Sequence, residues 1–483
     1  MAPARAALTA LSQRLFPAPS VFRSKLSPSL WAGVTSDSTK TLQRVLQDNH
    51  NKWHVYFNEE GFHNHASHHV LATWALGANA QLIQAAYKSN EQREAFKSPE
   101  PITKDNFYAH LGDDKYYNSY MEFFRRALEQ QGISSVLEEY FFAQEANFPN
   151  DGHDSRLMLN RLMDSLYHPM IHIGYGLEFG LPGMLVEGLA QAAIHQALWP
   201  AMTPPSLWAE GSPVKSSEYS SGQHIFDILA DMAIDSNFAR IVNPDPESMA
   251  ILYHTYFDHQ VAVLAYAKRW VVDTASTADV QKKLEELVWL VTLIYGVGGW
   301  KRDAGFEADF FYMHLVTSSL FLSSYVNHLS AASLKKLLES YCTFALMWWV
   351  ARGRPPLDIA GFFATDIPTS SQMSAVSSDA LTFDAATSTA APPNPWLPII
   401  NSTLIHPDNH IAKLQRALAH YSTVYGERAA GQEDFARTKL IGAEKLDGSL
   451  FIRVAALSAE KLGRVAEGEK ASDWYRDGFY HTA

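Results

Sequence analysis

Apolar residues recur at three- to four-residue spacing along nearly the whole chain, and this spacing puts them on one face of a helix. Convincing alternation of polar and apolar residues, the pattern of a half-buried strand, is absent from the sequence. Pro169 suits the first turn of a helix, and Ser330 precedes another periodic segment. The pattern predicts an all-α fold, with helices over 41–53, 68–90, 119–132, 155–167, 183–198, 218–233, 281–297, 309–326, 331–353 and 410–426.

These helices are expected to form one large helical array or bundle over residues 41–483, because no repeat of fixed period divides the chain. Residues 365–396 are rich in Ser, Thr, Ala and Pro, which indicates an insertion between the last helices. Residues 1–40 are expected to be a flexible or draping N-terminal arm. Residues 1–35 contain no Asp or Glu and several Arg and Ser, a composition also typical of an organelle-targeting segment.

Composition narrows the class of protein. Hydrophobic residues make up 47% of the chain and charged residues 19%, as in a globular protein. The net charge of -12 argues against a nucleic-acid partner, because phosphate binding needs a basic surface. Cys342 is the only cysteine, so a disulfide framework and a cysteine-based metal site are excluded, and an intracellular, cytoplasmic location is expected. No apolar run reaches the roughly 18–20 residues of a membrane span.

Several cofactor and catalytic motifs are missing from the sequence. No GxGxxG follows a predicted strand, and no GxxxxGK[ST] phosphate loop is present. The GxSxG elbow of many hydrolases and the HExxH motif of zinc proteases are absent as well. An oxidation carried out by this chain would therefore not use a Rossmann-bound flavin.

Histidines cluster beside the most apolar predicted helices. On a helix, His65, His68 and His69 would share one face. Imidazole suits Fe, Zn or Cu, and a helical bundle is a natural cage for inward-pointing ligands, so the cluster predicts a metal site buried among the helices. Each histidine alone, His195 above all, is equally typical of an ordinary core residue. The histidines concerned are His63, His65, His68, His69, His168, His172, His195, His314, His406 and His410.

An iron site that activates oxygen usually also needs an anionic ligand. The carboxylates near the histidines are Glu178, Asp309 and Asp408. Lys413 is a further candidate, because it lies three residues after His410 and so on the same helix face. A buried lysine loses its charge readily, and the neutral amine can take up CO2 as a carbamate with carboxylate-like oxygens. An exposed helix lysine is the alternative.

The sequence resembles the questin oxidase-like family of fungal polyketide pathways. The resemblance is carried by segments that together span most of the chain, namely 64–78, 168–179, 187–195, 314–322 and 394–418. It implies an oxygenase that uses O2 to open the central ring of an anthraquinone-type polyketide, questin- or versicolorin-like, by a formal Baeyer–Villiger insertion. Such reactions belong to xanthone- and aflatoxin-type pathways. The resemblance also implies non-haem Fe(II), no flavin, and NADPH as reductant, acting on the quinone directly or through a separate quinone reductase.

With this resemblance, the histidines acquire expected roles. His168 or Tyr175 would act as general acid on the developing phenolate. His69 and His168 are the next candidates as iron ligands, or would orient the ligands by hydrogen bonds. The expected iron ligands are His65 or His68, His172, His314, His410 and carbamylated Lys413. The aromatic residues expected to stack on the substrate are Trp74, Tyr175, Phe179 and Trp300.

Two other classes of function stay open at this point. In the first, the enzyme holds no metal, and histidines act as bases while a reduced quinone reacts with oxygen directly. In the second, the chain is a non-catalytic helical scaffold, although the lack of a fixed repeat argues against it.

Overall fold

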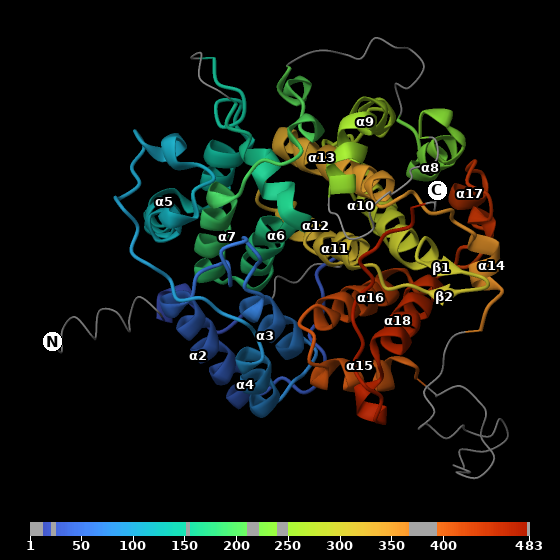
Figure 1. The fold of residues 1–483 in the computed structure, drawn as a ribbon, viewed down its shortest axis with the longest axis horizontal. Helices are drawn as coiled ribbons and strands as arrows, with labels where there is room; N and C mark the ends of the chain where they lie inside the picture. Colours follow the sequence, from blue (N-terminus) through green and yellow to red (C-terminus); the bar gives the residue numbers. More distant parts are fainter. Residues whose placement is uncertain are drawn as a thin grey trace.

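The computed structural model describes residues 13–20, 26–150, 155–209, 222–238, 250–366 and 394–480. Within these residues the chain is a packed array of helices (Figure 1), and its strands are the short antiparallel pair β1 (Trp300–Lys301) and β2 (Gly305–Phe306). The all-α prediction is confirmed for this part of the chain. Most of the expected insertion, residues 367–393, lies outside the described residues, as do 1–12 and 21–25 of the expected arm.

The longer helices mostly agree with the predicted segments. Segment 155–167 continues to residue 179 across a break at 164–167, and segment 309–326 forms two helices. Segment 68–90 forms two helices, because the backbone reverses at Gly77 with φ +91°, where residues 32–33 cross it too closely for a side chain. Three helices were not predicted from the sequence, namely α9, α15 and α18. The apolar residues of α9 lie on all sides and leave little periodicity. The helices are α2 (Ser36–Lys52), α3 (Ala66–Ala75), α4 (Ala80–Lys88), α5 (Tyr117–Leu137), α6 (Met158–Phe179), α7 (Pro182–Ile194), α8 (Ile225–Ile234), α9 (Ala250–Ala267), α10 (Thr277–Thr292), α11 (Phe310–Ser319), α12 (Leu322–Tyr325), α13 (Ala331–Ala351), α14 (Ile359–Phe363), α15 (Trp396–Ile405), α16 (Ile411–Tyr425), α17 (Glu433–Ala436) and α18 (Ser449–Leu462).

Four helices from distant parts of the sequence close around the middle of the molecule. Helix α3 packs on α6, α6 on α11, α11 on α16, and α16 again on α3. In Figure 1 these helices run from blue (α3) through green and yellow (α6, α11) to orange-red (α16) and meet near the centre. Side chains that point inward from all four helices therefore converge on one small volume.

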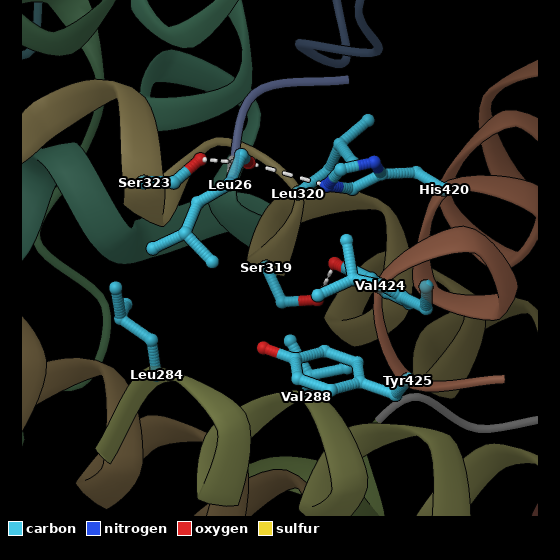
Figure 2. A pocket seen from close by; sticks show the side chains of 10 residues that line it. Leu26, Leu284, Val288, Ser319, Leu320, Ser323, His420, Val424 and Tyr425 are labelled. Atoms are coloured by element: carbon cyan, nitrogen blue, oxygen red, sulfur yellow. Dashed lines mark hydrogen bonds between the residues drawn. The ribbon is translucent and has the colours of Figure 1, made fainter. Parts of the chain in front are cut away.

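The described part of the N-terminal arm lies against this helical body. Phe16 is buried, and its carbonyl accepts a hydrogen bond from the Gln43 side chain (3.1 Å). The carbonyl of Leu26 accepts hydrogen bonds from Ser323 Oγ (3.1 Å) and from His420 Nε2 (3.2 Å), as Figure 2 shows. These bonds hold residue 26 over α12 and α16, above the small apolar pocket of Figure 2.

Two further expectations concern the core and the membrane. Cys342 is buried in α13, and burial raises the pKa of its thiol well above the usual value, which suits an inert core residue. Among the helices of the described ranges, none combines the length and the apolar composition required to cross a membrane.

Candidate metal centre

Three histidines from three different helices meet inside the four-helix frame. One ring nitrogen from each of His65, His314 and His410 lies within 4.8 Å of the other two. His65 precedes α3 and His410 precedes α16 as N-terminal cap residues, whereas His314 lies in the middle of α11. Three converging imidazole nitrogens at this spacing match the requirements of a divalent transition metal.

His168 of α6 adjoins this group of three. Its Nε2 lies 2.8 Å from Nε2 of His65, and its ring centroid is 4.9 Å from that of His314. Its Nδ1–H donates to the carbonyl of Ser165 (2.5 Å), and Nδ1–H of His314 donates likewise to the carbonyl of Phe310 (2.7 Å). A carbonyl only accepts, so both rings carry their proton on Nδ1 and turn an Nε2 lone pair inward, the form that binds a metal. We call His65, His168, His314 and His410 the inner histidines.

Polar atoms at this centre are buried without a partner. Nε2 of His314, Nε2 of His410 and Nζ of Lys413 have no hydrogen-bond partner among the described residues. A buried polar group left unpaired costs on the order of 1–3 kcal/mol. A bound cation would satisfy the two imidazole lone pairs at once, so the donor set fits a metal.

The inner histidines and Lys413 are held in the protonation states that metal binding needs. Burial, together with the charges of neighbouring rings and of Lys413, lowers the pKa values of His65, His168 and His314 well below 6.5. Burial lowers the pKa of His410 to about 4. Burial also lowers the pKa of Lys413 to about 7, so its neutral amine is accessible near neutral pH.

A helix break positions His168. Residues 164–167 interrupt α6, and Ser165, Leu166 and Tyr167 have φ values of 44°, 59° and 62°. Side chains disfavour this left-handed region by about 1–2 kcal/mol per residue. The break leaves the carbonyl of Ser165 free to orient His168, and Pro169 starts the helical turn that follows, as its sequence context predicted.

The predicted ligands His68 and His172 lie outside the inner group. His68 Nε2 is 3.1 Å from His172 Nδ1, and His172 Nε2 is 2.9 Å from a carboxylate oxygen of Glu187. The other oxygen of Glu187 is 2.7 Å from His50 Nδ1. Burial alone would raise the pKa of Glu187, but the hydrogen bonds from His172 and His50 lower it to about 2. We call His50, His68, His172 and Glu187 the outer series.

Sequence reasoning missed Glu187 and His50, although Glu187 falls in one of the segments that carry the family resemblance. The hydrogen-bond partners of the predicted His63 and His69 lie outside the inner group. His63 Nε2 is 2.8 Å from His195 Nε2, and the His63 ring stacks on His168 at 3.8 Å. Nδ1 of His69 is 3.3 Å from the amide nitrogen of Asn90.

The candidate carboxylates are each engaged elsewhere. Asp309 caps α11 and forms an ion pair with Arg352 (2.6 Å). Glu178 pairs with Arg416. Asp408 accepts the backbone N–H of His410 (2.7 Å); burial would raise its pKa, but His410 holds that pKa well below the usual range. Of these three, Asp408 lies nearest to the inner histidines, with an oxygen 3.5 Å from His410 Nδ1.

Three of the four predicted aromatic residues form one wall beside the histidines. Tyr175 stacks on His68 (5.2 Å) and on Phe179 (6.2 Å), and Trp74 packs edge-on against Phe179 (5.6 Å). Burial raises the pKa of the Tyr175 phenol well above 10, so it stays protonated. Trp300 lies instead in β1 against Phe362 (5.9 Å).

The chain is similar to a known protein family and to several fungal proteins. The family model described as questin oxidase-like matches residues 62–418, which include every inner histidine and Lys413. The Baeyer-Villiger oxidase ptaJ of Pestalotiopsis fici is 27% identical over 67% of this chain and 71% of its own length. The questin oxidase of Aspergillus terreus is 24% identical over 80% of this chain and 82% of its own. Because the family match covers most of the sequence, the protein belongs to the questin oxidase-like family.

Proposed function

We propose that the protein is an oxygenase that opens the central ring of an anthraquinone-type polyketide by a formal Baeyer–Villiger insertion, at an Fe(II) centre among the inner histidines. The observation that carries this proposal is a group of buried nitrogen atoms that could bind a metal and have no hydrogen-bond partner among the described residues. They are Nε2 of His314, Nε2 of His410 and Nζ of Lys413. The names of the relatives, Baeyer-Villiger oxidase and questin oxidase, support the class of reaction. A fungal polyketide such as a questin- or versicolorin-like anthraquinone is the proposed substrate.

The residues that would hold Fe(II) are the four inner histidines, with the carbamate of Lys413 as the anionic ligand. Position favours His168 over the expected His172, because Nε2 of His168 lies 2.8 Å from Nε2 of His65, whereas both ring nitrogens of His172 are engaged in the outer series. His68, the alternative to His65, is bonded to His172 through Nε2. Lys413 is favoured over Asp408 because its nitrogen has no partner and burial lowers its pKa to about 7. When bound, Fe(II) would supply the one-electron chemistry that lets triplet O2 react with a closed-shell ring.

The chain's own residues would bind and orient the quinone. Tyr175, Phe179 and Trp74 offer a flat apolar wall next to the histidines. The protonated phenol of Tyr175 can donate a proton to a developing phenolate, whereas the N–H of His168 is already donated to Ser165. NADPH enters this proposal as the reductant of the quinone, directly or through a separate reductase.

Metal content measured by mass spectrometry on protein purified without a histidine tag tests the proposal. Wild type should contain close to one iron per chain, and His314→Ala and Lys413→Ala should both lose it. The control is His406→Ala, since His406 is equally buried but donates Nε2–H to the carbonyl of Leu462. If iron were lost only from His314→Ala, Lys413 would not be a ligand, and Asp408 would become the candidate for the anionic ligand. Active wild type without metal would contradict the iron centre.

A metal-free oxygenation is the second candidate, and the outer series favours it. His68 contacts His172, and His172 contacts the carboxylate of Glu187. A histidine supported by a carboxylate in this way could act as a base and deprotonate a phenol. This candidate predicts that His172→Ala abolishes turnover while His314→Ala lowers the rate without changing metal content.

A further inference from the structure

A cavity of about 220 Å3 lies between the N-terminal arm and α16. Its outer wall is residues 28–31, and its inner wall includes Arg416, Ala419 and His420. The arm is fixed on both sides of this wall, at Leu26 by Ser323 and His420 (Figure 2) and at Trp31, whose N–H donates to the carbonyl of Ala75 (2.9 Å). Complete ligand pockets usually measure about 300–1,000 Å3, so this cavity suits one end of a polycyclic ligand.

Arg416 lines this cavity, and its guanidinium is buried beside the phenol of Tyr175. Its side chain is 3% exposed, and Nη2 donates to Glu178. Nε and Nη1 have no partner among the described residues, and neither has Oε2 of Glu178. A guanidinium with two free N–H positions in one plane matches an oxyanion such as a phenolate or a carboxylate.

The charges around the cavity favour an anion. Burial would lower the pKa of Arg416, but Glu178 raises it above its usual value, so the guanidinium stays charged. Burial raises the pKa of Glu178 despite the neighbouring guanidinium, which weakens the opposing charge. Burial, and then the charge of Arg416, lower the pKa of His420 to about 4, so this ring is neutral. Among the residues lining the cavity, Arg416 is therefore the one cation near neutral pH.

Arg416 also adjoins the aromatic wall of the candidate metal centre. Its guanidinium lies 5.1 Å from the ring centre of Phe179 and 5.8 Å from that of Tyr175, which in turn stacks on His68. Arg416 follows His410 by six residues along α16, a rise of about 9 Å. A fused three-ring ligand can span that separation.

We propose that Arg416 binds an anionic oxygen of the substrate, a phenolate or an aryl carboxylate, and so positions the polycycle along Tyr175 toward the inner histidines. The anthraquinone identity of the polycycle rests on the proposed function; the anion preference rests on Arg416 and the cavity. Arg416 is in this view a substrate-binding residue that selects acidic polycycles over neutral ones of the same shape.

Binding of three probes to the full-length protein, without oxygen, tests this assignment. The probes are anthraquinone-2-carboxylate, 2-hydroxyanthraquinone at a pH where its phenol is ionised, and the neutral anthraquinone-2-carboxamide. Wild type should bind the carboxylate at least about tenfold more tightly than the carboxamide, as expected for a charged hydrogen bond. If the ionised phenol also binds tightly, the site accepts oxyanions in general. If only the carboxylate binds tightly, the site is specific for aryl carboxylates.

The variant Arg416→Gln/Glu178→Gln removes both charges and leaves no unpaired buried ion, and its carboxylate preference should fall to about one. Arg428→Gln is the control, because Arg428 is also a buried guanidinium, paired with Glu285 (3.0 Å), and does not line the cavity. Equal binding of the acid and the amide by wild type would overturn the assignment even if the double variant does not fold. So would a preference that survives in the folded double variant. Because these ratios need neither iron nor turnover, a protein without iron that keeps the preference would refute the proposed function alone.

Discussion

The inner histidines and the outer series share two helices, α3 and α6, yet the hydrogen-bond partners of their histidines differ. His168 and His172 are four residues apart on α6, and His65 and His68 are three residues apart at the start of α3. Inward nitrogens of the inner histidines face one another or nothing, whereas His172 in the outer series is bonded at both nitrogens and backed by Glu187.

This difference shows what separates a candidate ligand from a supporting residue. Glu187 holds His172 by an ionic hydrogen bond, while backbone carbonyls fix His168 and His314 by Nδ1. Nε2 of His314 is then left without a partner among the described residues, and Nε2 of His168 faces Nε2 of His65. A buried ring nitrogen without a partner marks a candidate ligand, as in His314 and His410, and a ring bonded at both nitrogens, as His172 is, serves structure or proton transfer. His68, whose Nδ1 is also without a partner in the described part of the chain, stays a candidate ligand by the same criterion.

The largest effect should come from removing an inner histidine. In His314→Ala we expect turnover of an anthraquinone substrate to fall by more than about 100-fold, since loss of a supporting residue alone typically changes metal affinity or activity about 10–100-fold. Activity and iron content should fall together. If His314→Ala retained both its activity and its iron, His314 would not be a ligand of the metal centre.

Much of this fold follows from the sequence, because helical periodicity depends on local spacing. The Ser330 cap is one example, since its side chain accepts the N–H of Ser333 (3.2 Å) as its position before a periodic segment predicted. The choice between His168 and His172 could not be made in the same way. It depends on the break at 164–167 and on Glu187 of α7, which are tertiary features. The position of Trp300 likewise depends on a tertiary feature, the β1–β2 pair.

The next largest effect should come from the outer series. Glu187→Gln keeps the shape but removes the charge that holds His172, so we expect activity to fall about 10-fold, within the range for residues that support a metal site. Iron content should stay close to that of wild type, in contrast to His314→Ala. Complete loss of iron in Glu187→Gln would show that the two groups act as one.

The same carboxylate should leave a signature in the pH dependence of stability. The pKa of Glu187 is about 2 in the folded protein, below its usual 4.5, so the folded state binds fewer protons within that window. Its contribution to the free energy of unfolding is therefore present above about pH 4.5 and lost as the pH falls toward 2, by about 2 kcal/mol between about pH 6 and about pH 3. Urea unfolding of wild type and Glu187→Gln should show their difference shrinking by this amount; a constant difference would contradict the depressed pKa.

The smallest effects should separate the aromatic wall from the remote tryptophan. Phe179→Leu removes a flat surface beside Tyr175, and loss of such an aromatic contact costs about 0.5–1.5 kcal/mol, so KM for an anthraquinone should rise about 3- to 10-fold. Trp300→Phe keeps an aromatic ring against Phe362 and should leave KM within about twofold, because that ring does not adjoin the wall formed by Tyr175 and Phe179. Steady-state kinetics at saturating oxygen measures both variants. If Trp300→Phe raised KM as much as Phe179→Leu does, the substrate would have to reach the β1–β2 pair. The aromatic wall formed by Tyr175, Phe179 and Trp74 would then not be the substrate-binding surface.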